Sequence, residues 1–267
     1  MRIGKQDEPF SAISTSTADR IVVRGKDLCG EIIGQWDFTS YFWFLVTGDR
    51  PDERQLFFAN AVLTAIAEHG LVPSAVAARM TLAAAPEAFQ GAVAAGLLGC
   101  GSVVLGSAEL AGRFLADLIA EAKAVGGDFG MAAAEGVRRL RSEKKAIPGF
   151  GHPLHSAGDP RALLLLRLAG ERGVEGDHVR MLRAVEKAVG ESLGRNLPIN
   201  VNGAIPAVML DVGFPLAALK GISLLARTAS LIGHLREESE RPIGFVLSGK
   251  AAEAVDYDGP AVDEDRP

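Results

Sequence analysis

Residues 149–161 read Gly-Phe-Gly-His-Pro-Leu-His-Ser-Ala-Gly-Asp-Pro-Arg. Two glycines frame a loop that presents His152, and the Asp-Pro-Arg after it predicts a helix with Arg161 in its first turn. A histidine exchanges a proton near neutral pH, and an arginine near a helix N-terminus favours anions. The stretch predicts an enzyme that moves a proton beside a carboxylated substrate. The same residues also fit a plain turn before an ordinary helix start.

The chain around this stretch is typical of an all-helical protein. Hydrophobic residues make up 48% of its 267 residues but aromatic residues only 6%, which favours helices over a β-sandwich. A short hairpin-like β arm is predicted within residues 11–30, and residues 251–267 are predicted to form a loose acidic tail. Helices are predicted at about 30–47, 52–69, 73–85, 87–104, 107–125, 130–145, 160–172, 177–194, 202–212 and 215–237.

Composition excludes several classes of function. The net charge is −5 without a Lys/Arg run, so nucleic acid is not expected as a partner. Cys29 and Cys100 are too few for a disulfide framework or a structural zinc site. His152 and His155 have Pro153 between them and no carboxylate at a useful spacing, so no metal is expected.

Neither a membrane nor a nucleotide phosphate is expected as a partner. The N-terminus shows no apolar signal segment, so we expect a cytoplasmic protein. Residues 88–108 carry no charge but are rich in Ala and Gly, which favours a buried core helix over a membrane span. Residues 244–251 match the spacing of a phosphate-binding loop, but Ala251 stands where Ser or Thr is needed and no amphipathic helix is expected to follow.

Further polar residues stand at helix ends or on an apolar helix. His69 ends a helix, Asn202 opens one, and Arg227 lies mid-helix among leucines with His234 seven residues on. Since a buried arginine must be paired or liganded, Arg227 favours a binding role. Purely structural alternatives remain open: a helix-end role for His69, an N-cap role for Asn202, packing or capping for His234 and an exposed, solvated side chain for Arg241.

These motifs together resemble the citrate synthase superfamily. The matching segments are 149–152 with 159–161, 200–203, 226–228 with 233–234, and 241–242, with weaker matches at 23–28 and 47–51. The resemblance implies an all-α, two-lobed fold with a short β arm. Its large domain would comprise 1–106 and 201–267, its small domain 107–200, and the site would lie in the cleft. A homodimer is also implied.

The resemblance also assigns roles to residues. It implies that His152 contacts the oxaloacetate carbonyl or citrate hydroxyl, and that His69 belongs to the same dicarboxylate pocket. Arg161, Arg227 and Arg241 would hold carboxylates, with Arg241 crossing from the partner subunit. Permanently charged, bidentate donors suit several carboxylates better than lysine does.

Two positions depart from the synthase pattern. Val104 stands where synthases carry the histidine that stabilises the acetyl-CoA enolate. The lyase module of ATP-citrate lyase also lacks this histidine. Asn202 stands where the family has its aspartate base, and an amide cannot accept a proton from carbon. The Val104 change favours a lyase over a synthase, whereas Asn202 argues against enolisation by the usual route. With the lyase, the resemblance implies cleavage of citryl-CoA, a 3-hydroxy acyl-CoA, to acetyl-CoA and oxaloacetate by retro-Claisen chemistry.

Two alternatives stay open. One is a citrate or 2-methylcitrate synthase-type condensation of another acyl-CoA and oxo-acid pair. The other is a catalytically weak protein that binds CoA esters or citrate. In each case the partners would be a CoA thioester and a di- or tricarboxylate, with no cofactor bound.

Overall fold

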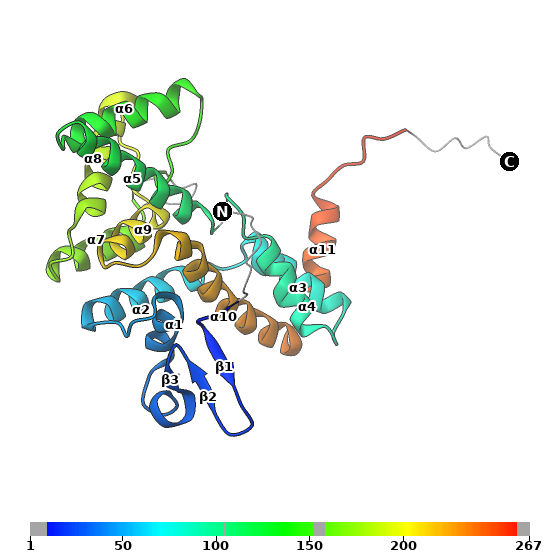
Figure 1. Cartoon of the computed structure of the whole chain (residues 1–267). Coiled ribbons are helices and arrows are strands. Elements are labelled where there is room, and N and C mark those ends of the chain that lie inside the picture. The colour runs from blue at the N-terminus through cyan, green and yellow to red at the C-terminus, as the bar shows by residue number, and fades with distance from the viewer. Residues whose placement is uncertain (1–9, 104, 152–157, 261–267) are drawn as a thin grey trace. The chain divides into compact units, whose positions relative to one another are not determined.

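A computed structural model describes residues 10–103, 105–151 and 158–260 (Figure 1). The α-helices are α1 Phe38–Thr47, α2 Glu53–Ala67, α3 Pro73–Ala84, α4 Phe89–Leu98, α5 Ser107–Ala124, α6 Phe129–Ser142, α7 Pro160–Glu171, α8 Asp177–Leu193, α9 Val201–Asp211, α10 Leu219–Glu240 and α11 Gly244–Glu253, with a 3₁₀ turn at Leu216–Ala218. The predicted all-α class is confirmed, because the sheet in the described residues is confined to the N-terminal arm.

The arm is a small antiparallel sheet of β1 Ser14–Ser16, β2 Ile21–Val23 and β3 Lys26–Asp27. In its register Val22 pairs with Thr15 on one side and Asp27 on the other. The predicted β arm is thus confirmed.

The predicted first helix begins too early. Residues Leu28–Ile32 form a separate π-helical turn, and α1 starts only at Phe38. Two aspartates set these starts: Asp27 accepts hydrogen bonds from the Cys29 and Gly30 amides, and Asp37 accepts one from the Ser40 amide.

Helix α11 was not predicted, and the expected tail from residue 251 begins too early. The N-cap residue of α11 is Ile243, whose side chain makes no capping hydrogen bond. Instead Glu238, near the end of α10, accepts hydrogen bonds from the backbone amides of Ile243 and Gly244. Because the cap comes from the preceding helix, the local start signals of a helix are missing from the sequence.

The chain divides into two compact units. The first unit comprises residues 1–65 and 107–222, and the second comprises 66–106 and 223–267, so boundaries fall inside both α2 and α10. In the first unit α5, α7 and α8 pack on α9, whose residues Gly203–Met209 are all buried. In the second unit α3 and α4 pack on the later part of α10 through Ala78, Ala92 and Leu231.

These units divide the chain differently from the predicted large domain (1–106 and 201–267) and small domain (107–200), although both divisions change at residue 107. The predicted domains stay a prediction.

In the described part of the chain one helical stretch, Leu216–Glu240, is long and apolar enough to cross a membrane by length and composition alone. That stretch includes buried Arg227 and Glu238, which suits a core helix better than a lipid-facing one.

Candidate active site

In the first unit, residues 149–151 lie against the start of α9. The Asn200 amide donates to the Gly149 carbonyl (3.0 Å), and the Gly151 amide donates to the Pro198 carbonyl (2.8 Å). The Asn200 side chain adds a bond from Nδ2 to the Gly151 carbonyl (2.6 Å). The backbone just before His152 is therefore fixed beside the α9 N-terminus. His152 itself, like His155 and Val104, lies outside the described residues.

A glycine pair makes this approach possible. A Cβ on Gly203 would lie 2.5 Å from the Gly149 carbonyl oxygen, and a Cβ on Gly149 would lie 2.7 Å from the Gly203 Cα. Gly149 also has φ +87°, which other residues rarely adopt. The loop that leads to His152 thus requires glycine on both sides of the contact.

Asp159 joins the predicted anion-binding Arg161 to this same place. Its carboxylate is fully buried and accepts from Arg161 Nε and Nη2, both at 3.0 Å. It also accepts from the backbone amides of Arg161 (3.1 Å) and Val201 (2.9 Å). Burial alone would raise the pKa of Asp159, but these bonds outweigh burial and lower it. Arg161 is thereby aligned with the start of α9, and its Nη1 makes no hydrogen bond within the described residues.

Asn202 lies in the first turn of α9, but it is not the cap. The N-cap is Asn200, whose side chain accepts from the Asn202 amide (2.9 Å), so the N-cap reading of Asn202 is wrong. The Asn202 Oδ1 is buried and has no hydrogen-bond partner among the described residues. A buried acceptor without a hydrogen bond destabilises the folded protein. Such an unpaired acceptor is typical of a binding or catalytic position.

In the second unit, Arg227 likewise has a buried side-chain atom without a hydrogen-bond partner among the described residues. Its side chain is 2% exposed, its Nη1 donates to Ser230 Oγ (3.3 Å), and its Nε has no partner within the described residues. Burial lowers the pKa of the Arg227 guanidinium, against the opposing influence of Glu68 and Cys100. A buried cation with open donors suits a carboxylate ligand.

Glu68 connects Arg227 with His69. One carboxylate oxygen of Glu68 accepts from the backbone amides of His69 (2.9 Å) and Gly70 (2.6 Å). The other accepts from the Ser230 hydroxyl, which itself accepts from Arg227. His69 is half-buried just after α2. Sequence reasoning missed Glu68, since an acidic residue at a helix end carries no signal of its own.

His234 is held from both sides. Its Nε2 lies 3.2 Å from Glu68, and its Nδ1 lies 3.5 Å from the Arg79 guanidinium. Since Arg79 can only donate, Nδ1 accepts and Nε2 carries the proton that faces Glu68. Packing or capping alone therefore does not describe His234.

Arg79 of α3, which sequence reasoning also missed, is buried and ion-paired. It contacts Glu238 (2.7 Å) and Glu237 (2.8 Å). Its position in an Ala-rich helix gave the same signal as Arg227, a charge on an apolar segment. Arg241, predicted to serve a partner's site, has a side chain 78% exposed and paired with Glu237.

The predicted site residues thus form two clusters. Arg161 at the start of α7 and Asn202 at the start of α9 lie in the first unit, where Asp159 connects the two helix starts. His69, Arg227 and Arg241 lie in the second unit. Their assigned roles stay predictions. Within the described residues no three His, Cys, Asp or Glu side chains gather as a metal site requires.

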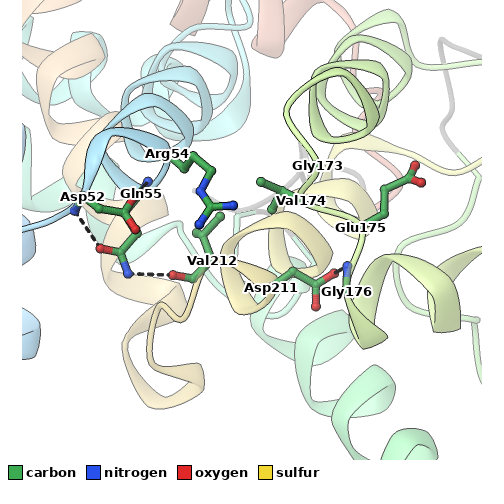
Figure 2. A pocket seen from close by; sticks show the side chains of 9 residues that line it. All are labelled: Asp52, Arg54, Gln55, Gly173, Val174, Glu175, Gly176, Asp211 and Val212. Atoms are coloured by element: carbon green, nitrogen blue, oxygen red, sulfur yellow. Dashed lines mark hydrogen bonds between the residues drawn. The ribbon is translucent and has the colours of Figure 1, made fainter.

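A separate cavity of about 250 Å³ in the first unit contains none of these residues (Figure 2). It is lined by Asp52, Arg54, Gln55, Gly173, Val174, Glu175, Gly176, Asp211 and Val212. Asp211 caps the start of α8 by accepting from the amides of Gly176 (2.8 Å) and Val179 (3.0 Å). The carboxylate therefore has a structural role in the cavity wall.

Comparison with known proteins places these clusters in context. Residues 11–243 match the family described as citrate synthase, C-terminal domain. The fold superposes on a citryl-CoA lyase from Hydrogenobacter thermophilus with a TM-score of 0.84 and 28% identity, covering 98% of this chain and 97% of that one. An ATP citrate lyase from Methanothrix soehngenii, solved with citrate and coenzyme A, shares the fold at a TM-score of 0.77 and 23% identity, covering 99% of this chain and 44% of that one.

Among curated sequences, a probable ATP-citrate synthase of Dictyostelium discoideum is 26% identical over 92% of this chain. The chain spans only 41% of the length of that relative.

Proposed function

This chain belongs to the citrate synthase family, and from that premise we propose that it cleaves citryl-CoA to acetyl-CoA and oxaloacetate. The observation that carries the proposal is the similarity to a citryl-CoA lyase over nearly the full length of both chains. An ATP citrate lyase that is longer than this chain shares the same fold.

The cleavage is a retro-Claisen reaction. A base takes the proton of the citryl C3 hydroxyl, the oxygen electrons form the oxaloacetate carbonyl, and the C2–C3 bond breaks. Its electron pair passes into the thioester enolate, which becomes acetyl-CoA when C2 takes up a proton. We assign the hydroxyl proton to His152, and water is the enolate's proton source in this proposal because Asn202 cannot supply one.

The carboxylates of the oxaloacetate part would be held by Arg161, Arg227 and Arg241, with His69 beside them. Arg227 supports this assignment because its buried Nε lacks a partner within the described residues. Arg161 supports it through the Nη1 that Asp159 leaves open. Arg241, which is exposed on its own chain, would act in the neighbouring subunit of a homodimer.

We also propose that the protein works in the cytoplasm, with CoA thioesters as substrates and no bound cofactor. Two cysteines are too few for the disulfide framework of a secreted protein, which suits a reducing compartment.

A binding protein without turnover is the second candidate. Asn202 favours it, because the position of the family base is occupied by an amide whose oxygen is buried and makes no hydrogen bond within the described residues. Because cleavage and condensation pass through the same enolate, Asn202 does not separate the lyase from the synthase. The similarity to a citryl-CoA lyase is what favours the lyase.

The test is turnover of citryl-CoA by the purified chain, with oxaloacetate and acetyl-CoA measured as products. Arg227→Lys keeps the charge but not the fork geometry, so kcat/KM should fall by about tenfold to a hundredfold. Citrate binding by calorimetry without turnover would favour the binding protein. Faster condensation than cleavage at equal enzyme concentration would favour the synthase.

A further inference from the structure

We propose that Glu68 is a positioning residue that orients both His69 and Arg227 toward the substrate carboxylates. This inference rests on the proposed function, since it concerns residues assigned to the same substrate. All of its contacts lie within the second unit.

The first contact fixes the backbone of His69. Helix α2 ends at Ala67, and Gly70 turns the chain with φ +72°. Between them, Glu68 Oε1 accepts from the amides of His69 (2.9 Å) and Gly70 (2.6 Å). The carboxylate thus satisfies the two backbone amides of the turn that carries His69, which would otherwise need water as a partner.

The second contact reaches Arg227 through a hydroxyl. Ser230 has one proton, and it donates that proton to Glu68 Oε2. Its oxygen is then left to accept from Arg227 Nη1 (3.3 Å). The carboxylate therefore decides which way Ser230 faces, and through Ser230 it holds one edge of the guanidinium.

The third contact keeps Glu68 in place and ionised. His234 faces Glu68 with a protonated Nε2 because Arg79 occupies its Nδ1. Burial would raise the pKa of Glu68, but the bonds from Ser230, Gly70 and His234 outweigh it and lower the pKa. Glu68 is half-exposed, so these bonds, and not burial among apolar residues, hold its side chain.

Charge alone would argue against a carboxylate here. A negative group close to Arg227 repels the carboxylates that Arg227 is proposed to bind. If Glu68 acted only through its charge, removing that charge by Glu68→Gln would strengthen citrate binding. If Glu68 orients His69 and Arg227, the same substitution weakens citrate binding. The reason is that the new side-chain amide would donate a proton to Ser230 and turn the serine hydroxyl proton toward the guanidinium. The sign of the change separates the two roles.

The experiment compares the parent chain with Glu68→Gln and Ser230→Ala, and with Glu253→Gln as a matched control. Glu253 is an exposed partner of Lys250 in the same unit. Citrate affinity is measured by calorimetry, and kcat and KM by citryl-CoA cleavage. Glu68→Gln should weaken citrate binding and raise KM by roughly tenfold, as for the loss of a charged hydrogen bond. Ser230→Ala should change both in the same direction by a smaller factor, and Glu253→Gln should match the parent.

Unchanged or tighter citrate binding by Glu68→Gln, in a parent that cleaves citryl-CoA, overturns the positioning role and leaves the proposed function intact. If circular dichroism shows that Glu68→Gln does not fold, Ser230→Ala decides by the same criterion. A parent that neither binds citrate nor cleaves citryl-CoA overturns the proposed function and the positioning role together.

Discussion

At the scale of single residues, Asp159 shows how one carboxylate serves a helix and a site at once. It caps α7, pairs with Arg161 through two nitrogens, and accepts from the first amide of α9. The Asp-Pro-Arg sequence predicts the cap and the arginine. It does not predict the bond to Val201, which lies 42 residues further along the chain. The local sequence therefore predicts Asp159 as a cap, but not the distant backbone amide that it binds in the folded protein.

Asp159 should make stability depend on pH. Its pKa is lowered in the folded protein, so its contribution is fully present above the unfolded value of about 4 and is lost as pH falls through the folded value. Asp159→Asn should therefore cost about 1–3 kcal/mol at pH 7, and less as pH falls through and below about 4. Denaturant unfolding at several pH values measures this, with exposed Asp117→Asn as the control. A cost that stays constant with pH would contradict the role of the ionised carboxylate.

Glu68 marks the limit of residue-scale prediction in the site. His69 and Arg227 stand out by their chemistry at a helix end and on an apolar helix. The residues that hold them do not, because their function depends on contacts such as Glu68 to Ser230, 162 residues apart. The predicted ligands were thus recognisable from sequence, and their supports were not.

Asn202 leads to a second prediction at this scale. Asn202→Asp would place a carboxylate in the first turn of α9, where the helix dipole favours it and burial raises its pKa toward that of a useful base. Solvent deuterium exchange into the acetyl-CoA methyl group should rise by roughly tenfold or more. The gain should stay below the roughly 10²–10⁴-fold of a well-placed base, because Val104 offers no hydrogen bond to the enolate.

Exchange is followed by proton NMR in deuterium oxide, with exposed Asn196→Asp as the control. If Asn202→Asp exchanges no faster than the parent, Asn202 does not stand at the position of the family base.

At the scale of elements, helix boundaries were predictable where the signal is local. Pro73 opens α3, Gly48 ends α1 in the left-handed conformation, and Asp159 with Pro160 opens α7. The prediction failed for α11, which Glu238 caps from the preceding helix, and for the π-helical turn that replaces the predicted start at residue 30. Both failures arise where a helix start depends on contacts that a 3.6-residue pattern does not encode.

The contact between residues 149–151 and α9 gives the prediction at this scale. Gly203→Ala would bring a Cβ within 2.5 Å of the Gly149 carbonyl oxygen, and since backbone cannot rotate away, the loop must shift. We expect a loss of about 1–3 kcal/mol in the free energy of unfolding and a larger proportional loss of citryl-CoA turnover, since the shifted loop leads to His152.

Gly190→Ala in α8 is the matched control. A Cβ there meets nothing within 4 Å, so alanine should stabilise the helix by about 0.5–1 kcal/mol. Equal effects of the two substitutions on stability would contradict the close approach.

At the scale of the whole molecule, the fold class and family followed from the sequence, but the compact units did not. Two of the three unit boundaries, after Ala65 in α2 and after Ile222 in α10, fall inside continuous helices, where no proline, glycine-rich or polar linker marks them. One continuous helix can pack in a different unit on each side of such a boundary, and its sequence shows no signal of the change. Which segments group together is therefore a property of long-range contacts that the order of helices does not determine.

The uncharged helix α4 carries the last prediction, which concerns assembly. Its ten residues contain no charge, yet only Ala92 and Gly96 are buried, and Leu98 is 88% exposed. Because so much uncharged helix surface is costly in water, we expect α4 to be covered by a second copy of the chain. Sedimentation velocity should show a species of twice the chain mass, and Leu98→Glu should shift it to the monomer. Leu163→Glu, at a 59% exposed position on α7, should leave the dimer intact. If the parent sediments as a monomer while it cleaves citryl-CoA, α4 is not an interface, and Arg241 cannot complete a neighbouring site.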